Sequence, residues 1–226
     1  MEILPAVEIE SFSDSDVNAS VIWLHGLGAD GNDFASIVPQ LNLPSDFGIR
    51  FVFPHAPSIP VSINNGLVMP AWYDIKQLDV ERHVDRPQLQ WSAARVHDLI
   101  AREIARGVSS ERIIIAGFSQ GGAVSFEAAL THDKPLAGII ALSTYFATAD
   151  SITINPLHRR IPILICHGSL DSVVPESLGR KSSETLQSLG FFPEFNSYPM
   201  EHAVCPQQID DISEWISQIL APAQKG

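Results

Sequence analysis

The chain has 226 residues, of which 45% are hydrophobic and 18% charged, and its net charge is −12 at neutral pH. This composition is ordinary for a globular protein with one large core. A surface so rich in negative charge repels nucleic acid and anionic lipid headgroups, so we expect neither as a partner. Two cysteines, Cys166 and Cys205, are too few for a disulfide scaffold.

The N-terminal residues 1–8 are acidic and lack the basic region and the apolar core of a signal peptide. No apolar run approaches the length of a membrane span. We therefore expect a cytoplasmic protein without stable membrane insertion. The sequence leaves open whether the chain forms a homodimer.

Short apolar runs alternate along the chain with stretches that repeat apolar residues at helical spacing. The expected strands are 21–24, 49–53, 113–116, 136–142, 163–166 and 194–198, and the expected helices lie around 96–104, 122–130 and 209–220. Several strands are apolar on both faces, as strands buried in a parallel sheet are. This alternation predicts one α/β domain over residues 1–226, with a mostly parallel central sheet flanked by helices on both faces.

One stretch, from about residue 54 to residue 90, interrupts the alternation. It contains five prolines and no clear periodicity, so we expect an irregular segment. A long irregular segment in a compact domain is usually functional. Our hypothesis is that it lines an apolar substrate groove, with Met69 and Trp72 as binding residues. The alternative is a cap that only packs on the core.

Residues 117–121 read Gly-Phe-Ser-Gln-Gly, between a β-branched apolar run and a helical stretch. A strand, a sharp turn and a helix around Gly-x-Ser-x-Gly hold a serine with its hydroxyl exposed above the sheet. We therefore expect Ser119 to be a nucleophile. A serine hydroxyl needs a base to take its proton and a carboxylate to orient that base.

In the α/β-hydrolase arrangement the acid and then the histidine follow the serine along the chain. His202 comes directly after the last expected strand, where catalytic groups collect in α/β sheets, and is the expected base. Asp171 lies in the loop after strand 163–166 and is the expected acid, with Glu176 and Glu201 as weaker competitors.

The other histidines after Ser119 have simpler explanations. His132 and His158 lie in polar surroundings and are expected to be solvent-exposed, and His167 closes a strand and is expected to be structural.

An oxyanion hole needs backbone N–H donors aimed at the developing charge. One donor is expected from Gln120, the residue after the nucleophile, and the other from Leu27, in the Gly-rich loop after the first expected strand. His25 is expected to fix that loop. A zinc site at His202 and Cys205 lacks further ligands at metal spacing, so neither a metal nor another cofactor is expected.

The motifs at residues 24–31, 69–74, 117–123 and 167–175, with the region around His202, resemble the phospholipase/carboxylesterase family. That family includes the acyl-protein thioesterases and bacterial carboxylesterases. The resemblance implies an α/β-hydrolase fold, the triad Ser119, Asp171 and His202, and the oxyanion donors Leu27 and Gln120. It also implies hydrolysis of acyl esters or thioesters, including lysophospholipids, without a cofactor.

The chain departs from the family pattern at two positions. Ser169 stands where the family often has a second acidic residue, and Glu201 stands where a methionine commonly precedes the histidine. These changes leave the reaction class standing and make the substrate less certain. The alternatives are a non-catalytic binding protein on the same scaffold, which would not turn over a p-nitrophenyl ester, and a peptidase or dienelactone-type hydrolase of the same fold.

Overall fold

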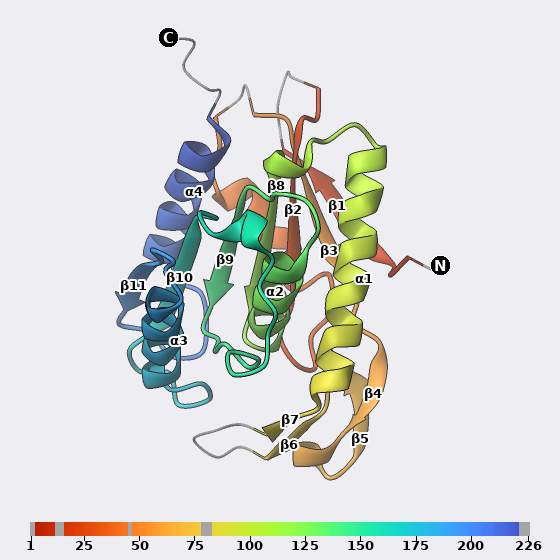
Figure 1. Cartoon of the computed structure of the whole chain (residues 1–226), viewed down its shortest axis with the longest axis vertical. Coiled ribbons are helices and arrows are strands. Elements are labelled where there is room, and N and C mark those ends of the chain that lie inside the picture. The colour runs from red at the N-terminus through yellow and green to blue at the C-terminus, as the bar shows by residue number, and fades with distance from the viewer. Residues whose placement is uncertain (1–2, 12–15, 45–46, 78–82, 222–226) are drawn as a thin grey trace.

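A seven-stranded sheet forms the centre of the computed structural model, which describes residues 3–11, 16–44, 47–77 and 83–221 (Figure 1). The strand order is β1-β3-β2-β8-β9-β10-β11. The strands are β1 (Ala6–Glu10), β2 (Ala19–Leu24), β3 (Ile49–Pro54), β8 (Ile113–Phe118), β9 (Gly138–Leu142), β10 (Ile163–Gly168) and β11 (Glu194–Tyr198). All neighbours pair in parallel except β1, which is antiparallel to β3.

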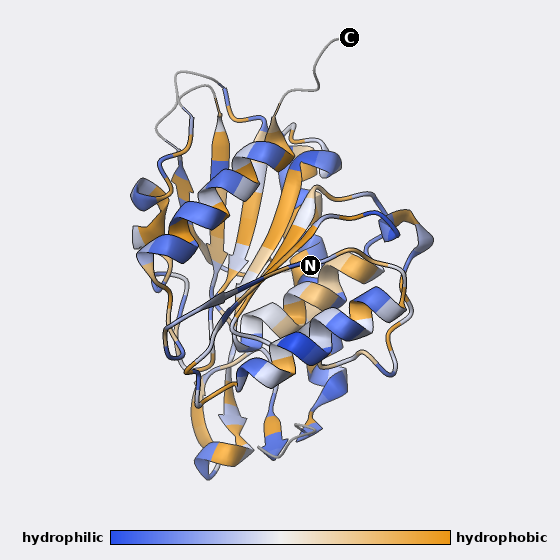
Figure 2. Ribbon diagram, turned by 90° about the vertical axis from the view of Figure 1, so that its left-hand side faces the viewer, coloured by the Kyte–Doolittle hydropathy of each residue, from blue (hydrophilic) through white to orange (hydrophobic). Residues whose placement is uncertain are grey.

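Helices cover both faces of this sheet, as the sequence predicts. The helices are α1 (Arg86–Ala105), α2 (Gln120–Thr131), α3 (Glu176–Ser188) and α4 (Pro206–Leu220), with short 3-10 turns η1 (Ala35–Gln40), η2 (Ser62–Asn64), η3 (Ser110–Arg112) and η4 (Pro156–His158). Successive residues of β2 point to opposite faces, so Ile22 belongs to the core cluster that includes α1, α2 and α3, while Trp23 belongs to the cluster that includes η1 and α4. In Figure 2 the strands are accordingly the most continuously hydrophobic elements.

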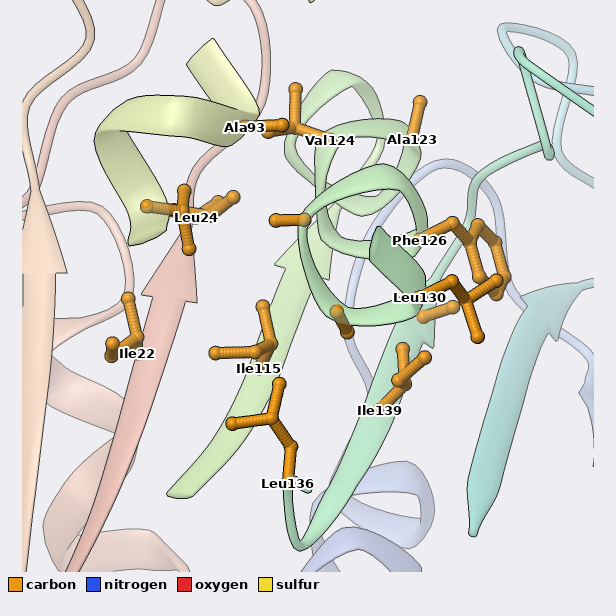
Figure 3. Close-up of a cluster of buried hydrophobic side chains, with 14 of the residues drawn as sticks. Ile22, Leu24, Ala93, Ile115, Ala123, Val124, Phe126, Leu130, Leu136 and Ile139 are labelled. Carbon is orange, nitrogen blue, oxygen red and sulfur yellow. The ribbon is translucent and has the colours of Figure 1, made fainter. Parts of the chain in front are cut away.

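Helix α2 lies directly on the sheet, and Figure 3 shows its side chains above β2, β8 and β9. Ten of its residues from Gly121 to Leu130 are buried, because α1 and the loop after β9 cover the sides that the sheet does not. A helix buried all round lacks a polar face and needs small residues wherever backbones come close. The serine at the start of α2 is therefore held by an immobile element.

The segment 54–90 is more regular than expected where the structure describes it. Strands β4 (Ser58–Val61) and β5 (Leu67–Pro70) form one antiparallel hairpin, and β6 (Ile75–Gln77) and β7 (His83–Val84) form another. Each strand has only two to four residues, so the alternation of apolar and polar positions is too short to recognise in the sequence. Both hairpins lie at the end of the sheet toward which β9 runs (Figure 1).

Candidate active site

Ser119 occupies the sharp turn between β8 and α2. Its backbone has φ 53° and ψ −117°, a conformation that residues other than glycine rarely adopt. The Ser119 N–H donates to the Leu142 carbonyl at 2.8 Å, which ties the turn to β9. A Cβ at Gly121 would lie 2.5 Å from the Leu24 carbonyl oxygen, and one at Gly117 would collide with the Gly121 backbone. The two glycines of the motif are therefore required by close backbone packing.

Asp171 and His202 come together although they are 31 residues apart. The Nδ1 of His202 lies 2.6 Å from Oδ2 of Asp171. The other carboxylate oxygen of Asp171 accepts from the N–H groups of Val173 at 2.9 Å and Val174 at 2.8 Å. The Asp171 side chain is fully buried, whereas that of His202 keeps 17% of its surface exposed. A buried carboxylate so bonded is fixed in position and orients the imidazole.

The loop that carries Asp171 rests on a second histidine. His167, fully buried at the end of β10, donates from Nε2 to the Val174 carbonyl at 2.8 Å, and that nitrogen lies 3.7 Å from Asp171 Oδ2. Burial lowers the pKa of His167 below its ordinary value of 6.5. The ring is therefore neutral, and it supports the loop as the sequence suggests rather than serving as the base. The competing carboxylates lie elsewhere, since Glu176 binds Ser197 and Arg180 and Glu201 is exposed.

The backbone of Leu27 and Gln120 lines the same cavity as Ser119. Within the described part of the chain, neither the Leu27 N–H nor the Gln120 N–H donates a hydrogen bond to another protein group. Unpaired backbone donors at a cavity wall can bind an oxyanion. His25 holds this loop as expected, since its ring lies 2.7 Å from the Gly26 carbonyl through Nδ1 and accepts from the Ala56 N–H through Nε2 at 3.1 Å.

That acceptor role requires a neutral His25 ring. Burial lowers the pKa of His25 below 6.5, which keeps Nε2 free to accept at neutral pH. The side chain of Gln120 adds a second tie, because it accepts from the Trp72 N–H at 2.8 Å and donates to the Tyr73 carbonyl at 2.6 Å. The two expected oxyanion residues are thus joined to one buried network.

Trp72 belongs to this network and does not line the cavity, contrary to the groove hypothesis. Its ring is only 1% exposed, and its Nε1 donates to the His25 carbonyl at 2.9 Å. Met69 is likewise absent from the cavity lining and lies against the oxyanion loop, where its sulfur would be 3.8 Å from a Cβ at Gly28. The positions of the Trp72 and Met69 side chains depend on how they pack against the loop after β2. No local pattern in the sequence reveals this packing.

The cavity above Ser119 has a volume of about 320 Å³ and a largely apolar wall. Besides Ser119, His202 and the oxyanion loop, it is lined by Asp33, Ile63, Ile75, Phe118, Tyr145, Val173 and Val174. Asp33 and Tyr145 were not predicted as cavity residues, although Tyr145 follows β9, where ligand contacts are common in α/β sheets. An apolar wall beside a serine and a paired histidine suits an acyl chain.

No group of three or more His, Cys, Asp or Glu side chains in the described residues is arranged to hold a metal ion. No helix among them is both long and apolar enough to cross a membrane. Cys205 lies at the start of α4 as a free thiol, and burial raises the pKa of the other thiol, Cys166, to about 12.

The family model described as phospholipase/carboxylesterase matches residues 5–220. An acyl-protein thioesterase 1 from Gibberella zeae is 38% identical over 219 residues, covering 92% of this chain and 93% of that protein. A second, from Neurospora crassa, is 38% identical over 213 residues, covering 89% of this chain and 87% of that protein.

Solved structures agree with the sequence relatives. Arabidopsis thaliana SOBER1 superposes with a TM-score of 0.84 at 30% identity, covering 90% of this chain and all of that one. Zea mays acyl-protein thioesterase 2 has a TM-score of 0.84 at 28% identity, with 96% of this chain covered and all of that one. The chain therefore belongs to the phospholipase/carboxylesterase family of α/β-hydrolases and is a serine hydrolase.

Proposed function

We propose that Ser119, Asp171 and His202 form a catalytic triad that hydrolyses acyl esters and thioesters through an acyl-enzyme on Ser119. The observation that carries this proposal is the 2.6 Å contact of the buried Asp171 with His202, which lines the same cavity as Ser119. The strained backbone of Ser119 supports it further, because such strain gathers at functional sites.

In the proposed reaction, Ser119 Oγ attacks the acyl carbonyl carbon while His202 Nε2 takes the hydroxyl proton. The carbonyl oxygen becomes an oxyanion and accepts hydrogen bonds from the N–H groups of Leu27 and Gln120. His202 then returns the proton to the departing alcohol or thiol. Water attacks the acyl-enzyme in the second half of the reaction, with His202 again as base, and the free acid leaves.

The apolar wall of the cavity supports a substrate with a hydrocarbon acyl group. Each buried CH₂ contributes about 0.8 kcal/mol, so a chain that follows Ile75 and Val174 would bind more tightly with length until the cavity is filled. The curated relatives are acyl-protein thioesterases. We propose that this chain likewise prefers acyl thioesters on protein cysteines. The rates on thioesters and on oxygen esters of the same acyl group would test this preference.

A cytoplasmic location is part of the proposal. Both cysteines are free thiols, which suits a reducing compartment. Fractionation of cells that produce the full chain would test it, with enzyme activity recovered in the cytoplasmic fraction as the expected result.

Replacing Ser119 by Ala tests the proposed mechanism. The change should lower kcat for p-nitrophenyl butyrate by several orders of magnitude, on the order of 10⁶, because the triad acts as a unit. Circular dichroism and the melting temperature should match the wild type, which separates lost chemistry from lost fold. A variant that keeps a tenth of the wild-type rate would exclude Ser119 as the nucleophile.

A further inference from the structure

A second and larger cavity, of about 520 Å³, lies beside the catalytic one. It is bounded by α3, by the loop after β9 and by β7 with the start of α1. Tyr145 lines both cavities and is therefore their common wall. The Tyr145 hydroxyl lies 2.9 Å from that of Tyr73, which is fully buried, so this wall is held in place.

Two further elements carry an apolar surface from one cavity into the other. Ile75 lines the catalytic cavity, and its partner across the β6–β7 hairpin, Val84, lines the second cavity. Val174, just before α3, lines the catalytic cavity, and Leu178, in the first turn of α3, lines the second cavity. An acyl chain on Ser119 that follows this apolar surface is led toward the second cavity.

The second cavity differs from the catalytic one in charge. Among the described residues of its lining, Arg86 and Lys181 face a single carboxylate, Asp150, in a chain whose net charge is −12. Arg86 and Asp150 neutralise each other in an ion pair of 2.6 Å, and the Arg86 guanidinium lowers the pKa of Asp150.

Lys181 is left without a counterion in this lining, since its ammonium group forms no ion pair with any residue that the structure describes. The neighbouring hydroxyls are already engaged. Ser182 accepts from the Phe146 N–H and donates to the Leu178 carbonyl, and Thr185 donates to the Lys181 carbonyl. Among the described lining residues, Lys181 is therefore the cation that remains available to an anion, and it lies on α3 close to the apolar Leu178.

We infer that this enzyme accepts acyl groups that end in a carboxylate, with the hydrocarbon along the apolar surface past Tyr145 and the distal carboxylate at Lys181. This inference rests on the proposed function and specifies the substrate class of the same site. A neutral acyl chain of equal length places a methyl group beside the Lys181 ammonium group, which then remains unpaired. Selectivity between the two acyl groups is therefore the quantity to measure.

The test compares p-nitrophenyl octanoate with mono-p-nitrophenyl suberate, which has the same number of carbons and a terminal carboxylate. Lys181→Met should lower the ratio of kcat/KM for suberate to kcat/KM for octanoate by about fivefold, the upper range for a partly exposed ion pair. Lys181→Arg should restore the ratio. Lys134→Met, a matched loss of a lysine outside both cavities, should leave the ratio at the wild-type value.

Three results would overturn the inference. Equal ratios in Lys181→Met and Lys134→Met would mean that Lys181 does not meet the acyl carboxylate. The acetyl ester of 3-hydroxybenzoate carries its carboxylate on the leaving group. If Lys181→Met lowered the rate on this ester and left the suberate-to-octanoate ratio unchanged, Lys181 would bind an anion of the leaving group instead. Wild-type protein that hydrolyses none of these esters would overturn the proposed function, and the inference with it, whereas the first two results leave that function standing.

Discussion

At the scale of single residues, the chemistry depends on how completely Asp171 is bonded. Both of its carboxylate oxygens accept hydrogen bonds, one from two backbone N–H groups and the other from His202. The two backbone donors prevent the group from rotating. An orienting acid needs a fixed position, because the imidazole must hold one tautomer during the reaction.

Replacing Asp171 by Asn should therefore slow chemistry by roughly 10⁴ in kcat while substrate binding persists. An amide in this position stabilises neither the required tautomer nor the imidazolium. Steady-state kinetics on p-nitrophenyl butyrate would measure the loss.

Glu176→Gln is the matched control, since Glu176 pairs with Arg180 at 2.9 Å on the surface of α3 and has no contact with His202. Its kcat should stay within about twofold of the wild type, as for most surface changes. A large effect of Glu176→Gln with a small effect of Asp171→Asn would assign the acid to Glu176.

At the scale of elements, the oxyanion loop after β2 is held from two sides. The hairpin β4–β5 ends in Pro70, whose carbonyl accepts from the Gly28 N–H at 2.9 Å, and Trp72 follows with its indole on the His25 carbonyl. The start of α2 binds the same segment through the Gln120 side chain. These contacts support the proposal that the segment around residue 70 positions the backbone donors of Leu27 and Gln120.

Trp72→Phe tests this structural role. The change removes the hydrogen bond to the His25 carbonyl and should lower kcat/KM about fivefold on all esters, the effect of losing about 1 kcal/mol. The ratio of rates on octanoate and acetate esters should stay at the wild-type value, because Trp72 does not line the cavity.

Trp91→Phe, on the surface of α1 where the ring is 48% exposed, is the control and should change neither quantity. If Trp72→Phe altered the chain-length profile while sparing the acetate ester, the indole would have to contact the acyl group after all.

At the scale of the whole molecule, three histidines meet where α1, the end of α2 and η4 come together. His132 and His158 are buried, contrary to the expectation of solvent exposure, and His97 packs on His132 with ring centroids 5.0 Å apart. Asp133 is the nearby carboxylate, 3.7 Å from His132 Nε2 but itself exposed. Burial lowers the pKa of both His132 and His158 below the ordinary value of 6.5, and the neighbouring His97 lowers them further.

The sign of the effect on stability follows from these pKa values. A histidine with a lowered pKa in the folded state binds protons more readily when unfolded, so its contribution is intact above pH 6.5 and is lost as pH falls through the folded pKa. We expect the free energy of unfolding of the wild type to fall between pH 7 and pH 5.5. Urea denaturation at both values would measure it.

His158→Phe should reduce that loss. The change removes one titrating ring, and the His132 carbonyl that His158 binds keeps its bond from Asn155. His83→Gln, at an exposed position, should behave as the wild type. An unchanged pH dependence in His158→Phe would show that other groups govern the acid sensitivity.

The six sheet strands expected from the sequence all form. Five of them are buried and apolar on both faces, which leaves a local pattern, whereas the sixth, β11, is a partly exposed edge strand. The expected helices form for a similar reason. Strand β1 was missed because an edge strand with alternating residues, Ala6–Glu10, lacks the apolar run that marks the others. Helix α3 is absent from the expected helices, since it buries few large apolar residues.

The order of Ser119, Asp171 and His202, and their places after β8, β10 and β11, could be predicted from the sequence. This was possible because a parallel sheet brings the carboxyl ends of its strands to one edge. Tertiary structure alone decided that Trp72 and Met69 support the oxyanion loop, that His132 and His158 are buried, and that Tyr145 separates two cavities. The physical reason is that burial and cavity shape depend on contacts between elements far apart in the chain, and such contacts leave no periodic pattern in the local sequence.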